Sequence, residues 1–349
     1  MTTSQLKEIL KSNILVMATA DETNLSAIED YVQAGANLLL APACRRFDEE
    51  DEMMLEAFFN AAEDCAFVAG QIEAPEYELA DDDAFDAYYA SVVRQATYLD
   101  QMEVSMIFLT GIRDAASAKC AWYAIREASS LPVCVGICVG EDDASIKQAV
   151  SLLITLQALD VSAVGCTGMY IDDTLSVLTE LQAFTTVPLF SMSQSGSYLT
   201  PEEYSDYIPS FVHQKSAMLG LSSGSPAFVA AASKSVWQLS PLHPDFPVIN
   251  AVCSKDEIMF LDFSGKIVGR NKQLLEIKTE KKEELKQALA VFNLPGATPV
   301  CFHIKDIDLL EYAILHYAGR PAVKSDEYGE ITAKELGAMV LEADKEEKK

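Results

Sequence analysis

The sequence predicts an α/β protein: a (β/α)8 TIM barrel with a small C-terminal α+β domain. Short apolar runs rich in Val, Ile, Leu and Phe alternate with longer segments whose apolar residues recur every three or four positions. This alternation is typical of strands and helices in a parallel sheet. Eight such runs precede residue 236, and eight parallel strands close a barrel of roughly 250 residues. The chain has 349 residues, which leaves room for a second, smaller unit.

The predicted strands are continuously apolar because both faces of a barrel strand are buried. They lie at residues 14–18, 38–41, 67–71, 106–110, 133–138, 163–166, 189–191 and 217–221. Helical periodicity between them predicts helices at residues 23–34, 52–64, 84–101, 115–128, 143–159, 172–184 and 201–211.

The composition changes after residue 236. Residues 241–247 carry three prolines, which cannot continue a helix and indicate a linker. We therefore divide the chain into a barrel at 1–238 and a small α+β accessory domain at 239–349. The second unit is predicted to contain a hairpin (257–263 and 266–270, turning at Ser264 and Gly265), a helix at 279–292, a strand at 299–304, helices near 306–317 and 332–344, and a solvated Glu-Lys tail.

Composition excludes several classes of protein. The chain has 53 acidic and 26 basic residues, and its net charge of -27 repels nucleic-acid phosphates and anionic lipid surfaces. It has no apolar run of the roughly 18 residues that a membrane helix needs, and no N-terminal signal pattern. Its eight cysteines are scattered through apolar segments, which is typical of buried thiols in a reducing compartment. We expect a soluble, uncleaved, cytoplasmic protein that binds neither nucleic acid nor membrane.

Function in such a barrel is expected at the carboxyl ends of the strands. This rim is polar but carries no histidine, since the four histidines are His213, His243, His303 and His316. A histidine general base or a Ser-His-Asp triad in the barrel is therefore not supported. The sequence also lacks a Gly-rich phosphate loop and the HExxH and CxxC metal patterns.

Several segments, in order, resemble the homocysteine S-methyltransferase family, which includes the betaine-dependent enzyme and the first module of cobalamin-dependent methionine synthase. They are 31–40 (YVQAGANLLL), 67–70 (FVAG), 106–126 with Asp114 and the pair Ala118-Lys119, 163–166 (AVGC) and 218–226 (MLGLSSGSP). Their order and spacing cover about residues 10–236, and the resemblance implies a barrel that transfers methyl groups to a thiol.

The resemblance also implies a zinc ion held by three cysteine thiolates, one after the sixth strand and two after the eighth. This chain keeps Cys166 but has Ser222 and Ser223 at the other two positions. Neutral hydroxyls are poor zinc ligands beside thiolates, so we expect no bound cofactor, with zinc at Cys166 as the alternative. The acidic side chains implied for the substrate ammonium are also replaced, at 18–19, 40–42 and 109–110.

Two hypotheses follow. The first is a methyltransferase-like enzyme with an altered acceptor and a zinc-free site. Its candidate pocket residues are Thr19, Arg45, Gln71, Thr110, Cys166, Gln194, Ser222 and Ser223. The second is a barrel without catalysis that serves as a regulatory or scaffolding partner in a corrinoid or folate methyl-transfer system. The expected partners are a small methyl donor or acceptor, a corrinoid protein, or further copies of the chain.

Individual residues leave alternatives open. Cys166 is either a ligand or a buried apolar residue at a strand end. Arg45 and Arg46 either bind an anionic substrate or pair with the acidic residues 48–51. Residues 76–83 form either a solvated loop or a lid. The segments 299–303, 309–313 and 317–325 resemble a strand-helix-strand piece of the pterin-binding barrel of methionine synthase, but about 100 residues cannot build a second barrel.

Overall fold

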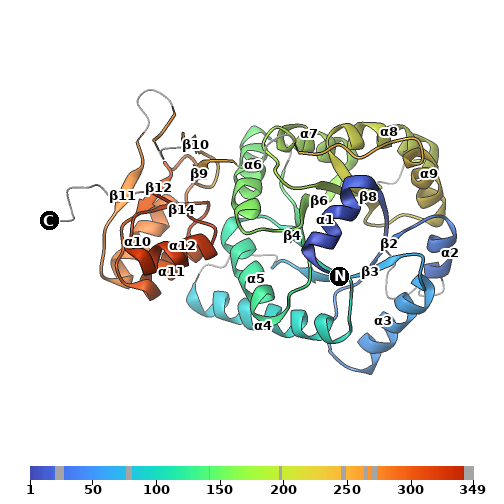
Figure 1. Cartoon of the computed structure of the whole chain (residues 1–349), viewed down its shortest axis with the longest axis horizontal. Coiled ribbons are helices and arrows are strands. Elements are labelled where there is room, and N and C mark those ends of the chain that lie inside the picture. The colour runs from blue at the N-terminus through green and yellow to red at the C-terminus, as the bar shows by residue number, and fades with distance from the viewer. Residues whose placement is uncertain are drawn as a thin grey trace.

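The computed structural model describes residues 1–19, 27–75, 81–140, 142–195, 199–244, 249–262, 266–268 and 273–341. Eight parallel strands form a closed barrel in chain order, with the last strand paired to the first (Figure 1). The strands are β1 (Leu15–Thr19), β2 (Leu38–Ala41), β3 (Phe67–Glu73), β4 (Met106–Ile112), β5 (Val133–Ile137), β6 (Ala163–Tyr170), β7 (Leu189–Gln194) and β8 (Ser216–Leu221). The predicted (β/α)8 barrel is confirmed, and each predicted strand overlaps an observed one.

Helices alternate with these strands and surround the barrel. They are α2 (Ile28–Gln33), α3 (Glu49–Ala62), α4 (Asp82–Gln101), α5 (Ala115–Ala128), α6 (Asp143–Ala158), α7 (Ile171–Leu181), α8 (Pro201–His213) and α9 (Pro226–Val236). Aspartate side chains accept hydrogen bonds from backbone N–H groups at the starts of α3, α4, α5 and α6. The residue before each helix therefore determines where the helix begins. The start of the predicted helix at 23–34 lies outside the described residues. Within the described ranges no helix has the length and apolarity needed to cross a membrane.

Successive side chains of each strand point alternately into the barrel and toward the helices, and they form two apolar layers. Inward side chains such as Met17, Leu40, Phe108 and Phe190 fill the barrel interior. Outward side chains such as Val164 pack against the helices. The barrel is therefore a packed core and not a pore.

A helix that we did not predict, α1 (Thr3–Ser12), covers the amino-terminal end of the barrel. Leu6 and Leu10 are fully buried in the interior cluster. Lys7 forms an ion pair of 2.8 Å with Asp160, which lies in the connection before β6. Thr2 and Gln5 form a reciprocal cap at the start of α1, so the first turn carries a recognisable sequence signal.

The C-terminal region, residues 249–341, combines helices with two small sheets. The antiparallel pair is β9 (Ala251–Cys253) with β10 (Ile258–Phe260). The other sheet is parallel throughout, in the order β11 (Leu275–Ile277), β12 (Val300–Phe302), β13 (Ala322–Val323), β14 (Met339–Val340). Its connecting helices are α10 (Lys282–Phe292), α11 (Ile307–His316) and α12 (Glu327–Glu335).

Two predictions for this region differ from the structure. The predicted hairpin is present as a single antiparallel bridge between Leu261 and Ile267, while β10 also pairs with β9; the turn lies outside the described residues. The predicted last helix at 332–344 is wrong. Asp326 caps α12 by accepting the N–H of Gly329, and Gly337 with φ of 74° ends it, which frees Met339 and Val340 to join the sheet. Residues 342–349 are not described.

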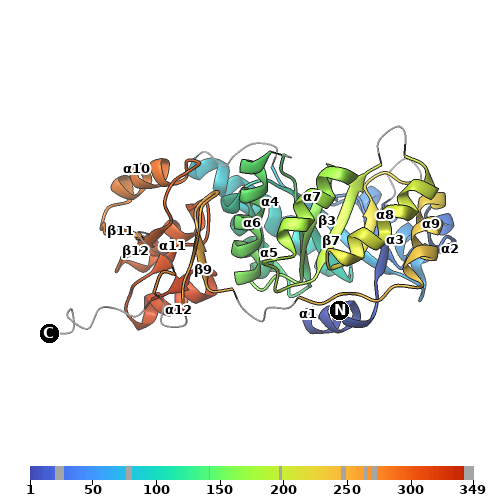
Figure 2. The ribbon, with the colours of Figure 1, turned by 90° about the horizontal axis from the view of Figure 1, so that it is seen from above.

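The C-terminal region packs on α4, α5 and α6, on one side of the barrel (Figures 1 and 2). Phe85 of α4 and Cys120 of α5 belong to the same buried cluster as Leu310 and Ile314 of α11. Asp82 of α4 contacts Lys282 at 3.0 Å, Lys286 at 2.9 Å and the Tyr312 hydroxyl at 2.9 Å. The two parts therefore share a core and a charged contact. The proposed domain boundary at residue 238 stays a prediction.

Lys119 of α5 is the most deeply buried charged residue at this junction, with an exposed fraction of 2%. Its Nζ donates to the carbonyl oxygens of Ile314, Tyr317 (2.6 Å) and Gly319 (3.1 Å). An ammonium group has three N–H donors, so each finds an acceptor at the carboxyl end of α11, where the helix dipole favours a cation. Burial lowers the pKa of Lys119 to about 7, whereas the three carbonyl acceptors favour the protonated, ammonium form.

Lys119→Met should destabilise the protein strongly. The substitution keeps the length of the side chain but leaves three carbonyl oxygens without their donor, and each buried unsatisfied group costs about 1–3 kcal/mol. We expect the free energy of unfolding, measured with urea, to fall by about 3 kcal/mol. Lys147→Met, at an exposed position of α6, is the control and should change little. Equal effects of the two substitutions would contradict the proposed role.

Asp82 should add stability that depends on pH. Burial opposes its ionisation, but hydrogen bonds from Lys286, Lys282 and Tyr312 outweigh burial and hold the pKa of Asp82 well below its usual range. The contribution is therefore complete above the pKa of an unfolded aspartate, about 3.9, and is lost as the pH falls through the lowered pKa.

Asp82→Asn should accordingly lower the free energy of unfolding by about 1 kcal/mol at pH 7, since the site is partly exposed and screened. The difference from the natural protein should shrink below pH 4. Urea titrations at pH 7, 4 and 2 measure this, with Asp83→Asn as the control because Asp83 is exposed. A difference that grows on acidification would refute the assignment.

Candidate functional site

The carboxyl ends of the strands form a mouth whose inward polar groups bond to one another. Gln71 of β3 donates its Nε2 hydrogen to the Thr110 hydroxyl of β4 at 2.9 Å. The Thr167 hydroxyl of β6 accepts the N–H of Gly111 at 3.1 Å. Thr110 and Thr167 are almost fully buried. These contacts form an uncharged hydrogen-bonding wall on the β3 to β6 side of the mouth.

The glycine at position 136 of β5 makes room for this wall. A Cβ at Gly136 would lie 2.2 Å from a side-chain carbon of Thr167, far inside van der Waals contact. Thr167 is not among the residues that the sequence predicts for the pocket. Its inward orientation follows from strand register, which the sequence alone does not fix.

On the opposite side, the candidate hydroxyls hold strand ends together. Thr19 donates to the carbonyl oxygens of Leu221 (3.1 Å) and Ser222 (2.9 Å), which ties β1 to β8. The Ser222 N–H donates to the Ser193 carbonyl at 2.9 Å, and the Ser222 hydroxyl contacts the same oxygen at 3.4 Å. Ser223 is exposed and Gln194, at the end of β7, is half-buried.

Cys166 does not face the mouth. Its neighbour Gly165 is directed inward, since a Cβ there would meet the Phe190 ring of the interior cluster. Cys166 points the other way and belongs to the outer layer with Val164 and Val135. It has no exposed surface, and burial together with nearby Cys138 raises the pKa of its thiol well above the usual range. Of the two interpretations of Cys166, this placement favours a buried apolar residue.

The two arginines after β2 are paired with different acids. Arg45 forms an ion pair of 2.8 Å with Glu73 at the end of β3. Arg46 pairs with Glu50 in the first turn of α3, and its backbone N–H donates to the Asp51 carboxylate at 2.8 Å. Pairing with the acidic segment 48–51 therefore holds for Arg46 but not for Arg45.

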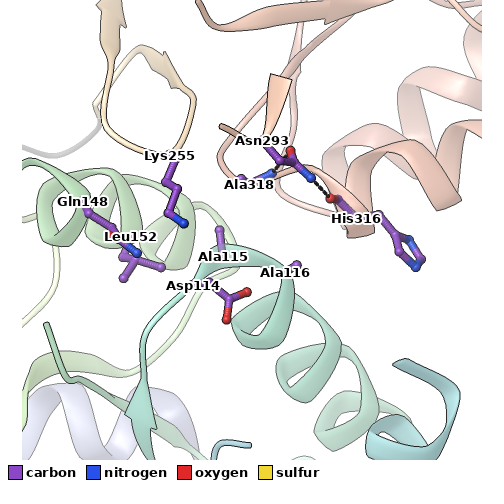
Figure 3. A pocket seen from close by; sticks show the side chains of 9 residues that line it. All are labelled: Asp114, Ala115, Ala116, Gln148, Leu152, Lys255, Asn293, His316 and Ala318. Carbon is purple, nitrogen blue, oxygen red and sulfur yellow. Dashed lines mark hydrogen bonds between the residues drawn. The ribbon is translucent and has the colours of Figure 1, made fainter. Parts of the chain in front are cut away.

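A second cavity, of about 110 Å³, lies between the barrel and the C-terminal region (Figure 3). On the barrel side it is lined by Asp114 and Gln148, and on the other side by Lys255 and Asn293. The Asn293 side chain binds the segment that ends α11: its amide donates to the His316 carbonyl and accepts the Ala318 N–H, both at 2.8 Å. Figure 3 shows the His316 ring turned away from the cavity. Sequence reasoning missed this cavity because its walls lie far apart in the chain.

Among the described residues, no group of three or more His, Cys, Asp or Glu side chains is placed to hold a metal ion. The predicted pocket residues are thus only partly brought together. Gln71 is hydrogen-bonded to Thr110, and the Thr19 hydroxyl is hydrogen-bonded to the Ser222 carbonyl between β1 and β8. Arg45 lies at the outer rim. Cys166 is directed away from all of them.

The fold and mouth define a (β/α)8 barrel with an uncharged hydrogen-bonding wall. No family model matches the chain, and no curated protein matches it in sequence. Among solved structures, it is similar to the homocysteine methyltransferase MmuM from Escherichia coli. The apo form is 17% identical with a TM-score of 0.53, over 66% of this chain and 98% of that chain. The metallated form is 17% identical with a TM-score of 0.52, over 66% and 99%. At this identity the likeness shows the barrel fold alone.

The placement of Cys166 predicts that its thiol is inert in the folded protein. In native buffer, iodoacetamide should alkylate the exposed Cys65 but not Cys166, because alkylation needs an accessible thiolate. In urea both should react. Peptide mass spectrometry measures the two rates, and a Cys166 rate equal to that of Cys65 in native buffer would place this thiol at the mouth instead.

Proposed function

We propose that this chain is a divergent homocysteine methyltransferase-like barrel without zinc-thiolate chemistry, which acts as a regulatory or scaffolding partner in a corrinoid or folate methyl-transfer system. The observation that carries the proposal is the outward orientation of Cys166, combined with Ser222 and Ser223 at the other two positions that the resemblance assigns to zinc.

The donor set does not fit a zinc ion. Zinc sites of the expected type need three thiolates that converge from one side. Here the one thiol is buried in the outer layer with a raised pKa, and the Ser222 hydroxyl is directed at a backbone carbonyl. A serine hydroxyl is neutral and competes poorly for zinc. We therefore derive no step of a reaction through this metal.

The mouth also favours binding over chemistry. Its inward groups at Gln71, Thr110 and Thr167 are amides and hydroxyls that do not ionise near neutral pH. The carboxylate of Glu73, which lies opposite Thr110 in the β3–β4 register, is held by Arg45. A general base poised near pH 7 needs a titratable group within reach of the substrate, and these side chains do not supply one.

The system in which the barrel works is inferred from resemblance. One solved structure with a similar fold is that of a homocysteine methyltransferase. The segment resembling part of a pterin-binding barrel folds as strand β12, helix α11 and strand β13. Its sheet has four strands, half the number in a (β/α)8 barrel. A methyl-transfer partner with a truncated second unit accounts for both features. Cytoplasmic location, the absence of nucleic-acid and membrane partners, and homo-oligomerisation belong to the same proposal.

A second candidate is zinc-free methyl transfer to a thiol or related acceptor. The observation that favours it is the hydrogen-bonding wall of Gln71, Thr110 and Thr167, together with Gln194 and Ser222. These groups could orient a polar acceptor. Methylation of homocysteine by the purified chain, with methylcobalamin or a methylated folate as donor and with chelator present, would favour this candidate over the first.

Metal content tests the zinc-free proposal. Protein purified without chelator should contain no stoichiometric zinc by elemental analysis, and Cys166→Ala should give the same value. The double variant Ser222→Cys with Ser223→Cys restores the cysteine count but should still fail to retain zinc, because Cys166 faces the outer layer. Stoichiometric zinc in the natural chain that is lost in Cys166→Ala would overturn the proposal.

A further inference from the structure

A groove of about 590 Å³ lies beside the barrel mouth, on the side of β2 and β3. We define it as the rim groove. Its walls are the loop that follows β2, the end of β3 and the middle of α4. We propose that the rim groove binds a small organic oxyanion, through its carboxylate or phosphate group.

The rim groove concentrates arginine in a protein that has little of it. The chain contains seven arginines, and Arg45, Arg46 and Arg94 all line this groove. Among the described residues that line it, Glu73 is the one acidic side chain. The chain as a whole carries a net charge of -27. The described lining of the groove therefore carries three guanidinium groups and one carboxylate, with Glu50 and Asp51 beside Arg46, in a chain whose net charge otherwise repels anions.

The existing contacts leave guanidinium donors available. In the described part of the chain, Arg45 makes one ion pair, with Glu73, and Arg46 makes one, with Glu50. Arg94 is exposed and makes no ion pair with any described residue. A guanidinium carries five N–H donors in a planar fork that matches the two oxygens of a carboxylate or phosphate. Structural pairing accounts for two of the three arginines and leaves Arg94 unexplained.

The walls between the arginines suit an organic ligand. Phe47, Ala74 and Pro75 supply apolar surface, while the Gln95 amide, which donates to Ser91 at 3.3 Å, supplies a polar edge. Ligand sites commonly combine apolar walls with a few placed polar groups. Glu73 also lies opposite Thr110 in the β3–β4 register, so the groove adjoins the hydrogen-bonding wall of the mouth. A ligand held by its anionic end in the groove would extend toward that wall.

Calorimetric titration with inorganic phosphate and with succinate tests the inference, at constant ionic strength set by chloride. At least one ion should bind saturably, and the tighter of the two assigns the ligand to the phosphate or carboxylate class. Arg94→Ala should weaken that binding about tenfold, as expected for loss of a charge-assisted contact. Arg113→Ala removes another exposed arginine outside the groove and should bind as the natural chain does.

Glu73→Gln provides a test with the opposite sign. It releases Arg45 and removes the lining carboxylate, so affinity should rise about threefold if the groove recognises anions. If the Arg45–Glu73 pair serves only to stabilise the fold, the substitution should not raise the affinity for the anion. The inference is overturned if neither ion binds saturably beyond the chloride control, if Arg94→Ala and Arg113→Ala lose affinity equally, or if Glu73→Gln does not strengthen binding.

Discussion

A single buried ammonium group joins the two parts of this chain. The Lys119 side chain extends from the barrel helix α5 and donates to three carbonyl oxygens at the end of α11. A charge in this position is costly to bury alone, but it is tolerated because every donor is paired and the helix end carries partial negative charge. Close packing accompanies it, since a Cβ at Gly319 would lie 2.1 Å from the Cys253 carbonyl oxygen. This contact acts with the shared buried cluster to hold the C-terminal region on the barrel.

Domains joined by small polar interfaces are expected to move relative to one another. Here the interface has features that oppose such movement. Phe85 and Cys120 from barrel helices complete the buried cluster of the C-terminal region, and the His316 ring stacks on Phe85 at 4.3 Å between ring centroids. Asp82 adds contacts to two lysines at the edge. The cavity at Asp114 and Asn293 therefore lies within a fixed junction. A scaffolding role is compatible with this rigidity, because a partner would meet both parts in one arrangement.

The sequence predicted the barrel well because each strand is encoded locally, by apolar runs bounded by polar caps such as Asp114 and Asp142. It predicted the orientation of side chains poorly, since inward and outward positions differ by one residue, and Cys166 was assigned to the pocket although Gly165 holds the inward position. Contacts such as that between Lys286 and Asp82 join residues 204 positions apart and leave no local pattern. Helix α1 precedes the first strand and so lies outside the strand-helix alternation that predicts the other barrel helices, although its cap at Thr2 is a local signal.

The hydrogen bonds of the mouth bear on whether this barrel still performs chemistry. A general acid or base must give or take a proton, whereas Thr19, Thr110 and Thr167 carry neutral hydroxyls that are hydrogen-bonded to neighbouring strands. The charged side chains of Arg45, Arg94 and Glu73 lie farther out, at the rim groove. The proposed ligand would be recognised by charge at the edge of this barrel and by neutral hydrogen bonds at its centre. Such recognition needs no metal ligand and no general base, so the same constraints that disfavour zinc-thiolate catalysis are consistent with selective binding.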